Sequence, residues 1–114
     1  MSMVVLHDYW RSSASYRVRI ALALKGVAAR SPQPLHLITA VTEHKAVLEV
    51  CAVLERHGWR VTRLPVDSGG MVDPADLEQA LTSETRLVSI MAANNEIGVL
   101  QPVQALAQVC RRRG

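Results

Sequence analysis

Short apolar runs alternate along the chain with longer stretches in which apolar residues recur every three or four positions. Four runs have the length and the Val, Ile and Leu content of strands: residues 3–6, 35–40, 59–66 and the run from Thr85 to the residue before Asn94. Four stretches have helical spacing: residues 14–25, 42–57, 74–81 and 103–112. From residue 35 onward, strand and helix alternate three times. This order predicts an α/β fold, a partial parallel sheet with flanking helices, preceded by a strand-helix segment.

Turn-forming and capping residues indicate where these elements end. Gly58 follows the second helical stretch, and glycine is the usual residue just past a helix. Pro65 closes the third strand run or puts it at a sheet edge, because proline cannot donate to a ladder. Asp73 and Pro74 have the order of an N-cap and a first helical residue. Residues 29–34 contain two prolines and no periodicity, so they are expected to form a linker.

The apolar run that begins at Thr85 is followed directly by the polar residues Asn94, Asn95 and Glu96, and then by Gly98 after one apolar position. A run of this composition is typical of a parallel strand that helices cover on both faces. Ligands of such sheets bind at the carboxyl ends of the strands. The sequence therefore predicts a binding site around the two asparagines.

Composition narrows the class of protein. The 114 residues are 49% hydrophobic, which suits one domain with a modest core. The net charge of +3 comes largely from arginines near the two ends, without the basic face that nucleic-acid binding needs. Cys51 and Cys110 lack metal-ligand spacing, so we expect free thiols and no metal. No signal peptide or membrane-length apolar run is present, so we expect a soluble cytoplasmic protein without membrane contact.

The segment Trp10-Arg11-Ser12-Ser13-Ala14-Ser15-Tyr16-Arg17 closely resembles the start of zeta-class glutathione transferases, the maleylacetoacetate isomerases. The resemblance extends over about residues 3–28. It implies that Ser12 assists a glutathione thiolate from the start of a helix, where a hydroxyl and free amides both stabilise an anion. The alternative reading of the same residues is that Ser12 and Ser13 cap the helix.

Three features of the remaining chain occur together: Thr42-Glu43-His44-Lys45 after one strand, Ser89-Ile90-Met91 within another, and Asn94-Asn95-Glu96-Ile97-Gly98 after it. With this spacing, residues 35–114 resemble the cysteine desulfurases, class V aminotransferase-like enzymes that use pyridoxal phosphate. The resemblance implies part of a fold type I large domain in which the strand at residues 35–40 lies between the other two. It also implies the family reaction, removal of sulfur from L-cysteine to give alanine for iron-sulfur cluster assembly. We therefore expect three parts: a transferase-like segment at 1–28, the linker at 29–34 and a partial desulfurase-like domain at 35–114.

The resemblance assigns cofactor contacts to two residues. His44 matches the histidine that stacks on the pyridine ring and moves protons, and Asn95 matches the asparagine that hydrogen-bonds the ring's phenolic oxygen. An imidazole offers a flat face and a nitrogen that titrates near neutrality, while an amide donates a hydrogen bond without adding charge. Without the resemblance, His44 would be a solvent-facing or capping residue at a helix start, and the two asparagines would be turn residues.

Other parts of the family's site have no counterpart in residues 35–114. The lysines are Lys25 and Lys45, and neither matches the family's Schiff-base lysine. The phosphate-binding turn, the carboxylate that pairs with the pyridine nitrogen and the catalytic cysteine loop are also unmatched. We therefore expect no desulfurase turnover from this chain alone and no covalent attachment of the cofactor. Two alternatives remain: a glutathione-dependent isomerase or transferase using Ser12, and a non-catalytic interaction module that forms a homo-oligomer through uncovered apolar surface.

Overall fold

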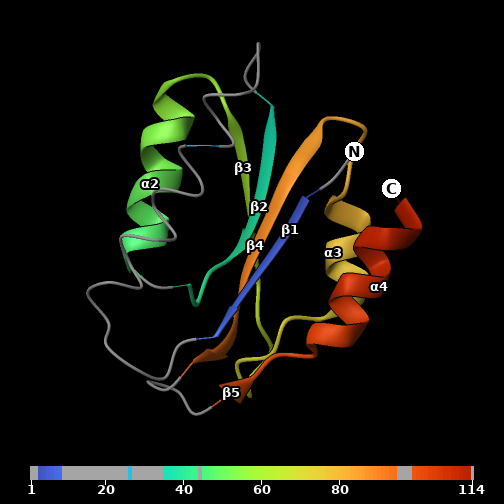
Figure 1. Cartoon of the computed structure of the whole chain (residues 1–114). Helices are drawn as coiled ribbons and strands as arrows, with labels where there is room; N and C mark the ends of the chain where they lie inside the picture. Colours follow the sequence, from blue (N-terminus) through green and yellow to red (C-terminus); the bar gives the residue numbers. More distant parts are fainter. Residues whose placement is uncertain (1–2, 9–25, 27–34, 44, 95–98, 114) are drawn as a thin grey trace.

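The computed structural model describes residues 3–8, 26, 35–43, 45–94 and 99–113. In this part of the chain, strands and helices make an α/β arrangement with one sheet (Figure 1). The strands are β1 (Met3–Asp8), β2 (His36–Ala40), β3 (Arg60–Leu64), β4 (Thr85–Asn94) and β5 (Val99–Leu100). The helices are α2 (Lys45–Arg56), α3 (Pro74–Ala80) and α4 (Val103–Arg113). The predicted linker and the whole of the predicted helix over residues 14–25 lie outside the described residues.

The sheet has the order β1-β4-β2-β3, and these four strands run parallel. The predicted arrangement of the three main strands is confirmed, because β2 lies between β3 and β4. Two features were not predicted. The N-terminal strand β1 joins the same sheet on the free side of β4. The two-residue strand β5 pairs antiparallel with the end of β4, so the alternation of strand and helix is interrupted there.

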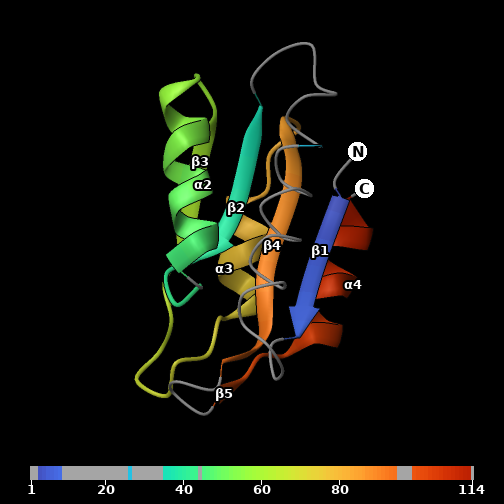
Figure 2. The same ribbon diagram turned by 60° about the vertical axis from the view of Figure 1, so that its left-hand side comes forward.

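Helices cover both faces of the sheet (Figures 1 and 2). On one face, α2 packs on β2, β3 and β4 through a cluster of buried residues: Leu37, Val47, Val50, Cys51, Leu54, Trp59 and Leu87. On the other, α3 and α4 pack through a second cluster, which includes Ile38, Ala40, Leu64, Leu77, Val88, Ile90, Leu106, Val109 and Cys110. Every residue of β2 is buried, which is why its sequence is a continuous run and does not alternate.

The predicted ends of the elements are confirmed by their hydrogen bonds. Gly58 follows α2 with φ 94°, and the Trp59 N–H donates to the Leu54 carbonyl at 3.0 Å, as in a Schellman motif. Before α3, Asp73 Oδ1 accepts from the Ala75 N–H at 2.9 Å, with Pro74 in the first helical position. These local signals fix the end of α2 and the start of α3.

The two cysteines, Cys51 and Cys110, are free and buried, as predicted, and they lie on opposite faces of the sheet. Burial raises the pKa of the Cys51 thiol to about 11 and also raises the pKa of Cys110. Among the described helices, none has the length and apolar character needed to cross a membrane.

Candidate functional site

The carboxyl end of β2 lies beside the middle of β4, because the two strands pair in parallel with Thr39 opposite Ser89, and β4 continues beyond this point to Asn94. Both of these residues are 0% exposed. Each follows by two positions a leucine of the core on the α2 side, Leu37 or Leu87. Since side chains alternate along a strand, Thr39 and Ser89 lie on the face that α2 covers. The buried side chains on the α2 side of the sheet therefore change from apolar to polar toward the carboxyl ends of the strands.

The two buried hydroxyl groups differ in their hydrogen bonding. Thr39 Oγ1 donates to the carbonyl oxygen of Ser89 at 2.9 Å. Ser89 Oγ has no hydrogen-bond partner among the described residues. Leaving a buried hydroxyl unsatisfied costs about 1–3 kcal/mol, so such a group calls for an explanation in a native structure.

A tight connection carries the chain from β2 to α2 beside these hydroxyls. The Val41 N–H donates to the Leu64 carbonyl of β3 at 3.0 Å, and the Glu43 N–H donates to the Ala40 carbonyl at 3.2 Å. Glu43 is only 5% exposed, whereas Lys45 is exposed at the first position of α2. The first turn of α2 contains no acidic residue. Because a helix N-terminus carries partial positive charge, this turn and Lys45 together favour an anionic group. We call Thr39, Glu43 and Ser89 the polar corner.

The predicted site residues His44, Asn95 and Ser12 lie outside the described residues, so their roles stay predictions. The sequence neighbours of the first two are described. Glu43 and Lys45 flank His44 between β2 and α2, and Asn94 ends β4. Because β2 and β4 pair in parallel, these neighbours belong to the same edge of the sheet as the polar corner.

A second group of buried polar residues lies at the opposite, amino-terminal end of the sheet. His36 Nδ1 is 2.7 Å from Thr85 Oγ1, and His36 Nε2 is 2.7 Å from Thr62 Oγ1. Burial lowers the pKa of His36, and the positive charge of Arg60 lowers it further, against an opposing effect of Glu84. His36 therefore ties three strands together as a neutral imidazole. Sequence reasoning missed this role, because the two threonines are 26 and 49 positions away along the chain.

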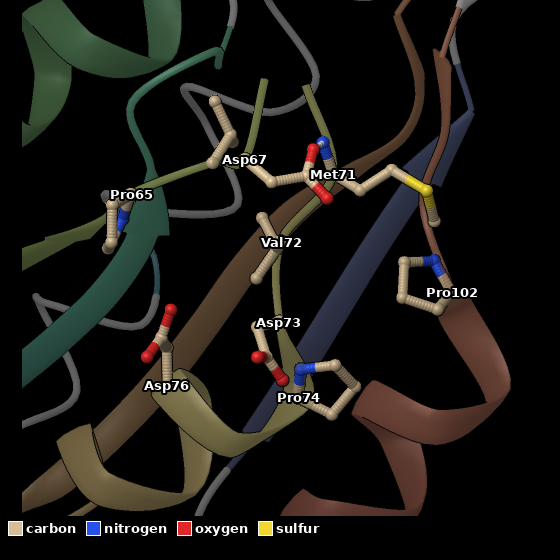
Figure 3. A pocket seen from close by; sticks show the side chains of 9 residues that line it. Pro65, Asp67, Met71, Val72, Asp73, Pro74, Asp76 and Pro102 are labelled. Atoms are coloured by element: carbon tan, nitrogen blue, oxygen red, sulfur yellow. Dashed lines mark hydrogen bonds between the residues drawn. The ribbon is translucent and has the colours of Figure 1, made fainter. Parts of the chain in front are cut away.

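A cavity of about 450 Å³ opens beside the starts of α3 and α4 (Figure 3). Figure 3 shows Pro65 on one side of it and Pro102 on the other. Two of its acidic residues are committed to local structure: Asp67 Oδ1 accepts from the Gly69 and Met71 N–H groups, and Asp73 Oδ1 caps α3. None of the lining residues belongs to the polar corner. In the described part of the chain, no group of three His, Cys, Asp or Glu side chains could hold a metal ion.

The class-V aminotransferase family matches residues 10–114, so the chain belongs to that family. Within it, the chain is cysteine desulfurase-like. It is 52% identical over 93 residues to the mitochondrial cysteine desulfurase of Drosophila melanogaster, covering 81% of this chain and 20% of that protein. It is 47% identical over 94 residues to the cysteine desulfurase IscS of Rickettsia africae, covering 82% and 23%. Its fold is similar to the solved structure of a NifS-like protein, with a TM-score of 0.81 and 40% identity over 86% of this chain and 27% of that one.

The lengths of these matches bear on two expectations from the sequence, the activity of the chain and its division into parts. The chain spans about a quarter of the length of its curated relatives, so the activity of the whole protein is not shown for it. The alignment with the Rickettsia protein covers 94 residues, more than the 80 residues from position 35 to the end, so it extends upstream into the predicted linker and beyond. The matches give no support to the glutathione transferase alternative, and the three-part division of the chain stays a prediction.

The relatives are pyridoxal phosphate-dependent, so the fit of this cofactor to the described residues can be examined. The buried hydroxyls of the polar corner, including Ser89 Oγ, suit a polar ring bound at this edge. The aldehyde of the cofactor needs a lysine amine with which to form a Schiff base. Lys45 is the one lysine among the described residues, and it is exposed at the start of α2. The described residues thus provide an unsatisfied polar group, Ser89 Oγ, on the edge where the ring is predicted to bind, and they supply no buried amine for a Schiff base.

Proposed function

We propose that this chain carries the ring-recognition part of a cysteine desulfurase-type pyridoxal phosphate site. The observation that carries the proposal is the parallel pairing of β2 with β4, which brings the turn containing Glu43 and Lys45 and the end of β4 to one polar edge. Family membership supplies the cofactor and the substrate class, the amino acid cysteine. The proposed reaction of the complete enzyme is removal of sulfur from L-cysteine.

When bound, the cofactor supplies an electron sink for carbanion chemistry on the amino acid. His44, between Glu43 and Lys45, would stack its imidazole on the ring of the cofactor and hold or move a proton at an imidazole nitrogen. Asn95, directly after Asn94, would donate its side-chain N–H to the phenolic oxygen. An amide does this without adding charge, so the electron demand of the ring is preserved.

A reducing compartment suits this proposal. Cys51 and Cys110 are both free, and free thiols persist in the cytoplasm. We therefore include a cytoplasmic location in the proposal.

The proposal is tested by titrating the purified protein with pyridoxal phosphate and following the absorbance of the cofactor. His44→Ala and Asn95→Ala are each expected to weaken binding about tenfold, which corresponds to about 1.4 kcal/mol. The matched controls are His57→Ala, which removes an exposed histidine after α2, and Asn94→Ala, which removes the neighbouring amide. Equal affinity in all four variants, or no binding by the unaltered chain, would overturn the proposal.

A further inference from the structure

The side chain of Gln101, between β5 and α4, is buried and holds a segment that is far away in the sequence. Gln101 is only 7% exposed. Its Oε1 accepts a hydrogen bond from the Val72 N–H at 2.8 Å, and its Nε2 donates to the Gly70 carbonyl at 2.9 Å. The amide thus bonds one N–H and one C=O of the same stretch of backbone, as a neighbouring strand would. We call this pair of hydrogen bonds the amide clamp.

Both sides of the amide clamp are attached to the rest of the protein. The Asp67 N–H donates to the Met71 carbonyl at 3.0 Å, and Asp67 Oδ1 accepts from the Met71 N–H at the same distance. Val72 is 1% exposed and belongs to the buried cluster under α3 and α4. On the other side, Gln101 precedes Pro102, and a residue before proline is restricted to extended conformations. The amide clamp therefore joins two constrained segments.

Gln101 also comes directly after β5, the strand that follows Asn95 in the chain. β5 pairs antiparallel with the end of β4, with Asn94 opposite Val99 (Figure 1). Residues 95–98 connect the two members of this pair. β5 has only two residues, and a hairpin this short is marginally stable by itself. The amide clamp is the next attachment along the chain, so it helps to hold β5 in its register beside β4.

We propose that Gln101 is a positioning residue of the cofactor site, which holds Asn95 in place through β5. The inference rests on the proposed function, in which the Asn95 amide donates to the phenolic oxygen of the ring. Gln101 acts through Asn95 and is not itself a ligand of the ring. A side chain that is already held in its binding position loses less conformational entropy when the ligand arrives, so the amide clamp adds affinity without touching the ligand.

The test uses pyridoxine 5′-phosphate, which has the phenolic oxygen and the phosphate but no aldehyde, so its binding is independent of any lysine. Calorimetry measures its affinity for the unaltered protein and for Gln101→Leu, which keeps the size of the side chain and removes both hydrogen bonds. Gln101→Leu is expected to weaken binding about tenfold, alone and combined with His44→Ala. Combined with Asn95→Ala, it is expected to cause no further loss, because residues that act through one another are not additive. The same tenfold loss in both combinations would overturn the proposal.

Two controls separate positioning from a general loss of stability. Gly58→Ala places a methyl group at φ 94°, at the amino-terminal end of the sheet, and is expected to lower the thermal stability without changing the affinity. Gln104→Leu makes the same substitution at an exposed position of α4 and is expected to change neither quantity. If Gly58→Ala weakens binding as much as Gln101→Leu does, the positioning role is refuted.

The outcomes also separate this inference from the function on which it rests. If the ligand binds and Asn95→Ala weakens binding, while Gln101→Leu leaves it unchanged, the role of Gln101 is refuted and the proposed function stands. If the unaltered protein does not bind the ligand, both are refuted. If Asn95→Ala binds as tightly as the unaltered protein, the role of Gln101 is refuted whatever Gln101→Leu does.

Amide hydrogen exchange tests the inference in the unaltered protein, without any variant. Because coupling between two sites is reciprocal, a saturating ligand should in turn stabilise the amide clamp about tenfold. Exchange of the Val72 N–H, which donates to Gln101, should therefore slow about tenfold more than exchange of the Trp59 N–H at the opposite end of the sheet. Equal slowing of the two N–H groups refutes the role of Gln101 even if Gln101→Leu fails to fold.

Discussion

Replacing Ser89 by alanine is expected to stabilise the protein. Ser89 is 0% exposed and its Oγ has no hydrogen-bond partner among the described residues, so removing the hydroxyl relieves a cost of about 1–3 kcal/mol. The void left by one oxygen atom, about 15 Å³, costs about 0.4 kcal/mol at about 24 cal/mol per Å³. The expected net gain is therefore about 1 kcal/mol. This is a measurable fraction of the roughly 5–15 kcal/mol that stabilises a domain.

Thr39→Val is the matched control, because it is a change of similar size at the register partner. Thr39 Oγ1 donates to the Ser89 carbonyl at 2.9 Å, so its loss is expected to cost about 1 kcal/mol. Urea unfolding without ligand measures both variants, which should shift the midpoint in opposite directions with an unchanged slope. If Ser89→Ala lowers the midpoint as Thr39→Val does, Ser89 Oγ has a partner in the native protein. The polar corner would then have no unsatisfied group to offer a ligand.

Two further predictions concern the opposite end of the sheet and the end of α2. Because burial and Arg60 lower the pKa of His36, the unfolded chain binds the proton more readily, so the free energy of unfolding should fall as pH drops below about 6.5. Urea titrations at several pH values measure this dependence of the unfolding free energy on pH. His36→Gln should make the dependence weaker, whereas His57→Gln should leave it unchanged. An equal pH dependence in the unaltered protein and both variants would refute the role assigned to His36. Gly58→Ala should destabilise by about 1–2 kcal/mol, because φ is 94° there. Both this variant and a control, Gly26→Ala, are measured by thermal unfolding. Gly26 is at a helical position with no atom within 4 Å of the added methyl, so Gly26→Ala should be neutral or stabilising. A loss of stability in Gly26→Ala comparable to that in Gly58→Ala would contradict the strain argument.

Local signals in the sequence predicted most of the elements because their causes are local. The run from His36 to Ala40 has the length and composition of a strand, as predicted, and the structure shows that every one of its residues is buried. Gly58 and Asp73 act through residues within five positions of themselves. The central position of β2 came from the family resemblance, since periodicity alone does not give strand order.

The features that escaped prediction depend on partners far away in the chain. β5 has two residues and is defined only by its pairing with β4, so it carries no periodicity of its own. The triad of His36, Thr62 and Thr85 is assembled by strand register. The pairing of β1 with β4 likewise joins residues more than 80 positions apart, and the sequence of a six-residue strand does not indicate which strand it will pair with. Ser89 belongs to one of the desulfurase-like motifs, but its unsatisfied hydroxyl results from its burial in the folded protein and could not be predicted from the sequence.

The position of β4 explains why these long-range features matter for function. It is the longest strand in the described part of the chain, and it pairs with β1, β2 and β5. β4 therefore borders β1, which comes before the desulfurase-like motifs in the sequence, β2, which leads into the first of them, and β5, which comes after the last. A ligand at this edge that contacts more than one of them stabilises their pairing, by about 2.7 kcal/mol at a hundredfold excess over its dissociation constant. We propose that the cofactor ring is such a ligand, in which case a change that weakens the β1–β4 pairing should also weaken ring binding.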